Sequence, residues 1–168
     1  LLGGFQWFVR RYLRKHFHAV ALNTQQLASV DLSPTDAMVV YANHASWWDP
    51  LTAVYMAESV FPQFRMYAPI DSRALAKYRM FAKLGFYPVE QDSRRGAAAF
   101  LATSRAILTH PAASIWMTPE GRFADPRDTS GELMPGLAHL AAQLSRQVET
   151  VGSHPRVWFV PAAVEYAF

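Results

Sequence analysis

The sequence predicts an α/β fold in which a mostly parallel sheet is flanked by helices on both faces and preceded by an N-terminal amphipathic helix. Short apolar runs rich in β-branched and aromatic residues alternate four times with longer segments of helical spacing. The connections between successive runs are too long for hairpins, so the strands are expected to run parallel with helices packed over them. A basic segment of helical spacing opens the chain.

That opening segment, residues 1–20, carries two apolar rows at helical spacing. Four basic side chains cluster in its middle: Arg10, Arg11, Arg14 and Lys15. The pattern has two interpretations, a helix that lies on a membrane surface with its arginines on anionic head groups, or a helix whose apolar stripe packs on the domain. We expect residues 21–168 to form the domain itself, truncated at its C-terminus, and native residues to be missing at both ends.

The remaining elements follow from apolar runs and from capping and turn residues. Strands are expected at residues 38–42, 65–70, 85–90, 113–118 and 157–164. Helices are expected at residues 50–60, 72–84 and 94–110, and from Pro135 onward, with Asp71 or Ser72 capping the second and Ser93 the third. Pro88 suggests an edge or a bulge for the third strand. A turn is expected at residues 33–36 and a loop at 123–134.

The composition indicates how many domains to expect, which partners suit the charge and which kinds of site are excluded. A chain of 168 residues that is 51% hydrophobic and only 17% charged is expected to form one domain with one core. The net charge of +3 suits anionic head groups, acidic acyl carriers or phosphate-bearing substrates, and no nucleic-acid-binding motif is visible. The absence of cysteine excludes disulfides, zinc–thiolate sites and a covalent acyl-cysteine intermediate. Abundant Ala and Arg hint at a bacterial source with a high GC content.

Two polar residues, Asn43 and His44, end the first predicted strand, and Asp49 stands directly before Pro50. An Asp-Pro pair is typical of a helix start, with the carboxylate capping free N–H groups and the proline at the first helical position. His44 is therefore expected in a strand-to-helix loop, where open α/β sheets usually bind their ligands, and it could meet Asp49 across that loop. In the alternative interpretation, Asp49 is only a cap and His44 is a partly buried ring satisfied by a backbone carbonyl.

A second motif, Thr-Pro-Glu-Gly-Arg at residues 118–122, ends the fourth predicted strand and should lie at the same sheet edge. The combination of Asn-His-x4-Asp with a downstream Pro-Glu-Gly resembles the glycerolipid acyltransferase family, which includes the lysophosphatidate acyltransferases. The resemblance covers residues 39–164. It implies catalysis by His44 and Asp49, supported by Asn43, Ser46 and Pro119. We expect the acceptor to be bound by Gln91, Arg94, Glu120, Gly121 and Arg122.

The sequence departs from the family pattern at two positions. The family usually continues Pro-Glu-Gly with Thr-Arg, whereas Arg122 follows Gly121 directly here. The arginine that relatives carry after the third strand is replaced by Gln91, with Arg94 and Arg95 close behind. Both positions bind the acceptor's phosphate in relatives. We therefore expect an uncharged or zwitterionic lipid alcohol to compete well against lysophosphatidate.

The resemblance implies a bacterial O-acyltransferase of phospholipid or other lipid metabolism, peripheral on the cytoplasmic face of the membrane. It would move a fatty acyl group from acyl-CoA or acyl carrier protein to a lipid alcohol such as a lysophospholipid, without metal or cofactor. His44 would act as general base without a covalent intermediate, because Gly-x-Ser-x-Gly and cysteine are both absent. The alternatives are a phosphate-free acceptor (aminolipid, glycolipid or glycosylated terpenoid), an acyl-thioester hydrolase and a non-catalytic lipid-binding module.

Overall fold

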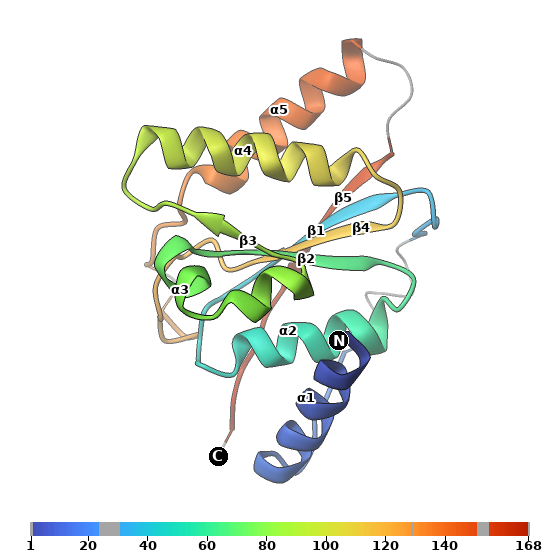
Figure 1. Ribbon diagram of the computed structural model, residues 1–168, viewed down its shortest axis with the longest axis vertical. Helices are drawn as coiled ribbons and strands as arrows, with labels where there is room; N and C mark the ends of the chain where they lie inside the picture. The colour runs from blue at the N-terminus through green and yellow to red at the C-terminus, as the bar shows by residue number, and fades with distance from the viewer. Residues whose placement is uncertain (1, 24–30, 129, 151–154, 168) are drawn as a thin grey trace.

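The computed structural model describes residues 2–23, 31–128, 130–150 and 155–167. Its centre is a five-stranded sheet in the order β3-β2-β4-β1-β5 (Figure 1). The strands are β1 (Ala37–Ala42), β2 (Arg65–Asp71), β3 (Phe86–Val89), β4 (Ala113–Met117) and β5 (Val157–Ala162). All neighbouring pairs are parallel, which confirms the predicted α/β class.

Helices cover both faces of this sheet, as Figure 1 shows. One face carries α4 (Arg94–Leu108) and α5 (Gly136–Thr150). The other carries α1 (Leu2–His16), α2 (Asp49–Val60), α3 (Ser72–Lys77) and the 3₁₀ helix η2 (Arg79–Leu84). No described helix combines the length and the apolar character needed to cross a bilayer.

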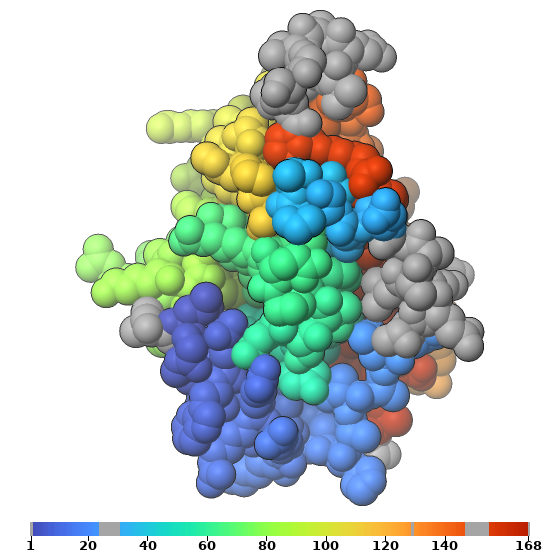
Figure 2. Space-filling view, turned by 90° about the vertical axis from the view of Figure 1, so that its right-hand side faces the viewer, coloured from blue at the N-terminus to red at the C-terminus, as the bar shows by residue number. Residues whose placement is uncertain are grey.

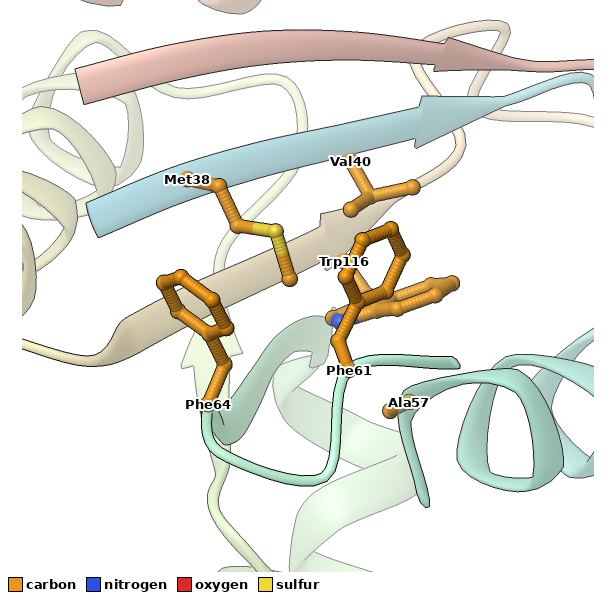
Figure 3. Close-up of a cluster of buried hydrophobic side chains, with 6 residues drawn as sticks. All are labelled: Met38, Val40, Ala57, Phe61, Phe64 and Trp116. Atoms are coloured by element: carbon orange, nitrogen blue, oxygen red, sulfur yellow. The ribbon is translucent and has the colours of Figure 1, made fainter. Parts of the chain in front are cut away.

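The core has two layers because successive side chains of β1 point to opposite faces of the sheet. On the α2 face, Met38 and Val40 pack in a cluster completed by Ala57, Phe61, Phe64 and Trp116 (Figure 3). On the α4/α5 face, Val39 packs with Leu108 and Leu140, all at most 2% exposed. Burial on both faces explains why β1 is a continuous apolar run rather than an alternating one.

The helix expected at residues 72–84 is interrupted. Asp71 caps α3 by accepting the backbone N–H groups of Arg73 and Ala74, as expected. Tyr78 then leaves the helical conformation (φ −118°, ψ 64°), and the chain continues as η2. Gly85 ends η2 at φ 97°, and a Cβ there would lie 2.5 Å from the Met66 carbonyl oxygen. The close approach of β2 therefore requires glycine at this corner.

Three other expectations are confirmed. Pro88 lies in β3, which is an edge strand. Ser93 caps α4 by accepting the Gly96 N–H. The turn at residues 33–36 is closed by the Asp36 N–H donating to the Ser33 carbonyl oxygen at 2.9 Å.

Several boundaries differ from those expected; α4, for example, ends at Leu108 rather than at residue 110. The first helix ends at His16 rather than at residue 20. The last strand ends at Ala162 rather than at residue 164. Its partner β1 ends at Ala42, and beyond that point the backbone of Val164 bonds with the Asn43 side chain instead of a strand.

The N-terminal helix α1 packs along α2, as Figure 2 shows in dark blue and green. Val9 and Leu13 are buried against Val54. The Arg10 guanidinium pairs with the Glu58 carboxylate of α2, with N···O distances of 2.9 and 3.1 Å. The apolar stripe of α1 therefore packs on the domain, which was one of the two interpretations of its sequence.

Candidate active site

The loops after β1 and β4 meet at the carboxyl edge of the sheet because these strands are parallel neighbours. The His44 backbone N–H donates to Glu120 Oε2 at 2.6 Å. The Ala124 N–H donates to the His44 carbonyl oxygen at 2.9 Å. The two sequence motifs are thus brought into direct contact at this edge.

His44 and Asp49 form a hydrogen-bonded pair. His44 Nδ1 lies 2.6 Å from Asp49 Oδ2, the Asp49 carboxylate is buried, and the His44 side chain is 21% exposed. A carboxylate only accepts hydrogen bonds, so Nδ1 carries the proton and donates it. The neutral imidazole then presents the lone pair of Nε2, which is the arrangement of a general base oriented by an acid.

Asp49 is not an N-cap, contrary to one interpretation of its position before Pro50. Helix α2 begins at Asp49 itself, and the capping position is Trp48, which makes no side-chain cap. Pro50 is accordingly the second helical residue rather than the first. Besides His44, Asp49 Oδ2 accepts the backbone N–H of Ser46 at 3.0 Å, a loop donor that precedes the helix.

Two supporting residues hold the loop in place. Asn43 donates through Nδ2 to the Val164 carbonyl oxygen at 2.8 Å and accepts the Val164 N–H at 2.7 Å. This pair of bonds fixes the segment that follows β5 against the end of β1. Ser46 contributes its backbone N–H to Asp49, and its hydroxyl oxygen accepts the Trp48 N–H at 3.4 Å.

The Pro-Glu-Gly loop is tightly packed. Pro119 is buried, and its carbonyl oxygen accepts the Met134 N–H at 2.7 Å. Gly121 has φ +65°, a backbone conformation that favours glycine, and a Cβ there would meet the Met134 side chain. Glu120, expected among the acceptor-binding residues, uses Oε2 to hold the His44 backbone.

Two aromatic side chains that sequence reasoning missed lie at the rim of the site. The Phe123 ring lies over the His44 ring with centroids 4.3 Å apart, and Trp47 lies 5.6 Å from Phe123. Phe123 is 49% exposed and Trp47 is 82% exposed. The feature of the sequence that could have identified both residues is their position within the two motif loops.

A third missed residue is Tyr166, which follows β5. Its hydroxyl donates to Asp49 Oδ1 at 2.8 Å and lies 3.1 Å from Thr52 Oγ1. Burial, followed by the neighbouring Asp49, raises the pKa of the Tyr166 hydroxyl well above its usual value, so this group stays protonated. No local pattern in the sequence signals this contact, since Tyr166 is 117 positions from Asp49.

The other expected acceptor-binding residues are not joined to the pair. Gln91 and Arg94 are exposed after β3, and two strands separate β3 from β1. At about 4.8 Å per strand, that separation is roughly 14 Å. Arg122 is exposed in the Pro-Glu-Gly loop. Within the described ranges, no hydrogen bond or ion pair connects Gln91, Arg94 or Arg122 to His44 or Asp49.

Among the described residues, no group of three or more His, Asp or Glu side chains is placed to hold a metal ion. The site chemistry visible in the structure is that of an imidazole, two carboxylates and a phenol.

A family model described as acyltransferase matches residues 22–165, which include both motif loops and all five strands. A comparison with curated proteins finds no match. The family match agrees with the glycerolipid acyltransferase motifs of the sequence. The chain belongs to the acyltransferase family and is an enzyme that transfers acyl groups from an acyl donor to a lipid acceptor.

Proposed function

We propose that this acyltransferase moves a fatty acyl group from acyl-CoA or acyl carrier protein to the hydroxyl group of a lipid alcohol. The observation that carries the proposal is the 2.6 Å hydrogen bond from His44 Nδ1 to the buried Asp49 carboxylate, which leaves Nε2 as a base at a partly exposed position. The reaction takes place at a membrane surface, on its cytoplasmic face.

The reaction needs one base and no enzyme nucleophile. His44 Nε2 takes the proton of the acceptor hydroxyl as its oxygen attacks the thioester carbonyl. The tetrahedral intermediate collapses, the C–S bond breaks, and the imidazolium returns its proton to the leaving thiolate. Asp49 holds the required tautomer and stabilises the imidazolium that forms between the two steps.

The rim of the site favours a phosphate-free acceptor. The exposed Phe123 ring packs against His44 and the exposed Trp47 ring packs against Phe123, while Gln91 and Arg94 follow β3, which two strands separate from β1. We propose that an aminolipid, a glycolipid or a glycosylated terpenoid is preferred over lysophosphatidate. A lysophospholipid is the second candidate, because Arg122 follows Gly121 in the loop that contacts His44.

The exposed surface of α1 supports the membrane location. Leu2, Trp7 and Phe8 are 49%, 65% and 47% exposed although α1 buries Val9 and Leu13. A hollow of about 470 Å³ along the same helix is lined by one indole and four cationic side chains: Trp7, Arg10, Arg11, Arg14 and Lys15. Such a surface suits anionic head groups with aromatic rings at the acyl boundary.

Thiol release from acyl-CoA and from acyl carrier protein, measured with and without a panel of lipid alcohols, tests the proposal. We expect acceptor-dependent release that falls by at least about 10²-fold in His44→Ala, the loss typical of a missing general base. Release that is independent of acceptor would indicate a hydrolase. Lipid binding with no release would indicate a binding module, and wild-type turnover in a folded His44→Ala variant would contradict the mechanism.

A further inference from the structure

We propose that Tyr166 is a positioning residue that holds the Asp49 carboxylate in the orientation that His44 needs. The proposal rests on the proposed role of His44 as the base. It is carried by the hydrogen bond from the Tyr166 hydroxyl to Asp49 Oδ1 at 2.8 Å. The family match ends at residue 165, so it assigns nothing to this tyrosine.

The hydrogen-bond directions around Asp49 are determined by chemistry. The carboxylate accepts at Oδ1 from Tyr166 and at Oδ2 from His44 Nδ1 and the Ser46 N–H. The Tyr166 proton is used in its bond to Asp49, so Thr52 must donate its own hydroxyl proton to the Tyr166 oxygen at 3.1 Å. Donors therefore run from Thr52 through Tyr166 to Asp49 on one side and from His44 on the other.

Tyr166 is held from three directions. Asn43 fixes the backbone of Val164, two residues before it. Thr52 lies one turn into α2 from Asp49 and binds the phenol oxygen. The Phe17 ring, just past the end of α1, packs on the tyrosine ring with centroids 5.7 Å apart. A buried carboxylate in contact with so constrained a donor has little freedom to rotate away from His44.

The expected effect concerns the protonation of the pair. Without the Tyr166 donor, the Asp49 charge is less well satisfied and attracts the His44 proton more strongly. As the pH falls, the imidazole then takes up its second proton sooner, so the competent state, a neutral imidazole beside a carboxylate, is lost at a higher pH. Among the described residues, the other titratable groups near the pair are Glu120, which accepts the His44 backbone N–H, and His16 of α1, whose ring packs against Trp48.

The test compares Tyr166→Phe with Tyr87→Phe as a matched control. The Tyr87 hydroxyl lies 2.9 Å from Ser104 Oγ of α4, so the control removes the same group at a site remote from Asp49. We expect Tyr166→Phe to lower kcat about ten- to a hundredfold, as for a hydrogen bond to a charged group, with little change in KM. The acidic limb of its kcat/KM profile should move to higher pH, while that of Tyr87→Phe stays in place.

A measurement without substrate separates this proposal from the proposed function. NMR of ¹⁵N-labelled histidine reports the tautomer and titration of His44 even if no acceptor is turned over. We expect the His44 titration midpoint to rise in Tyr166→Phe and to be unchanged in Tyr87→Phe. Thr52→Val keeps the phenol of Tyr166 but removes the hydroxyl that donates to it. In this variant the His44 titration midpoint should also rise, by less than in Tyr166→Phe, and Thr52→Val replaces Tyr166→Phe as the test if that variant fails to fold. The proposal is overturned if a folded Tyr166→Phe variant has the wild-type kcat/KM pH profile and the wild-type His44 titration midpoint. If only Thr52→Val folds, the same result in that variant overturns it.

Discussion

The Asp49 carboxylate accepts hydrogen bonds from His44, Ser46 and Tyr166 while exposing only 7% of its surface. Asparagine has nearly the same shape but presents an N–H₂ group as well as an oxygen. If that group faces His44 Nδ1, the imidazole must accept there, and Nε2 then carries the proton. A base with its proton on the wrong nitrogen cannot take one from the acceptor.

We expect Asp49→Asn to lose about 10²- to 10⁴-fold in kcat/KM, the range for a disabled general base, with a smaller drop in melting temperature than Asp49→Ala because its amide oxygen still accepts a hydrogen bond. Asp49→Ala should be destabilised further, by about 2 kcal/mol or more, because buried donors then lose their acceptor. Steady-state kinetics and thermal unfolding of both variants check this. A kcat/KM for Asp49→Asn equal to wild type would leave Asp49 without a role in orienting His44.

At the level of residues, what could be predicted depends on sequence distance. His44 and Asp49 are five positions apart across a strand-to-helix loop, and Glu120 follows a strand that was expected to run parallel to β1. These contacts follow from local patterns and a sheet rule. Tyr166 contacts Asp49 because the segment after β5 binds the Asn43 side chain through Val164. No local pattern in residues 155–167 predicts that path of the chain.

At the level of elements, α1 packs on the domain, as one interpretation of its sequence expected, and we propose that its remaining surface binds the membrane. Val9, Leu13 and the Arg10–Glu58 pair attach it to α2, and its remaining surface is basic and aromatic. The break at Tyr78 between α3 and η2 could not be predicted from helical spacing, since residues 72–84 keep that spacing on both sides of the break.

We expect the double variant Arg11→Glu and Arg14→Glu to bind anionic vesicles at least about tenfold more weakly at low salt, since each basic residue near such a surface contributes roughly 1 kcal/mol. Neither residue belongs to the Arg10–Glu58 pair, so α1 should stay packed on α2. The control is Arg95→Glu with Arg105→Glu on α4, which covers the opposite face and carries the same change in charge. Vesicle flotation measures both. Equal binding of the two variants would place the membrane contact elsewhere.

At the level of the whole molecule, the candidate active site lies at one end of the parallel sheet and an ion pair between the buried Asp36 and Arg156 lies at the other. The carboxyl edge holds His44, Asp49 and Glu120, whereas the amino edge is tied together at Asp36, directly before β1. The order β3-β2-β4-β1-β5, with β4 placed between β1 and β2, was not predicted from the sequence, because local patterns do not determine which strands become neighbours. It is this order that puts the two motif loops side by side.

Asp36 is buried and accepts hydrogen bonds from three groups. Arg156 donates at 2.8 Å, Trp158 Nε1 of β5 donates at 2.9 Å, and the Ser33 N–H donates at 3.0 Å. Burial by itself would raise the pKa of this carboxyl, but the bonds from Arg156, Ser33 and Trp158 outweigh it and hold the pKa below its usual value. Ionised Asp36 thus joins the turn before β1 to the start of β5.

A carboxyl whose pKa is lower in the folded than in the unfolded chain stabilises the fold above its unfolded pKa, near ~3.9, and loses that contribution as the pH falls through the folded value. We expect the wild-type free energy of unfolding to decline as the pH falls below about 4, and Asp36→Asn to show a shallower decline in that window because asparagine does not titrate. Urea unfolding at a series of pH values measures both curves, and the difference between them isolates Asp36 from the other carboxyls. Since Asp36 lies at the amino edge, kcat/KM of Asp36→Asn at neutral pH should match wild type. Parallel stability curves would show that the Asp36 contacts do not link folding to pH.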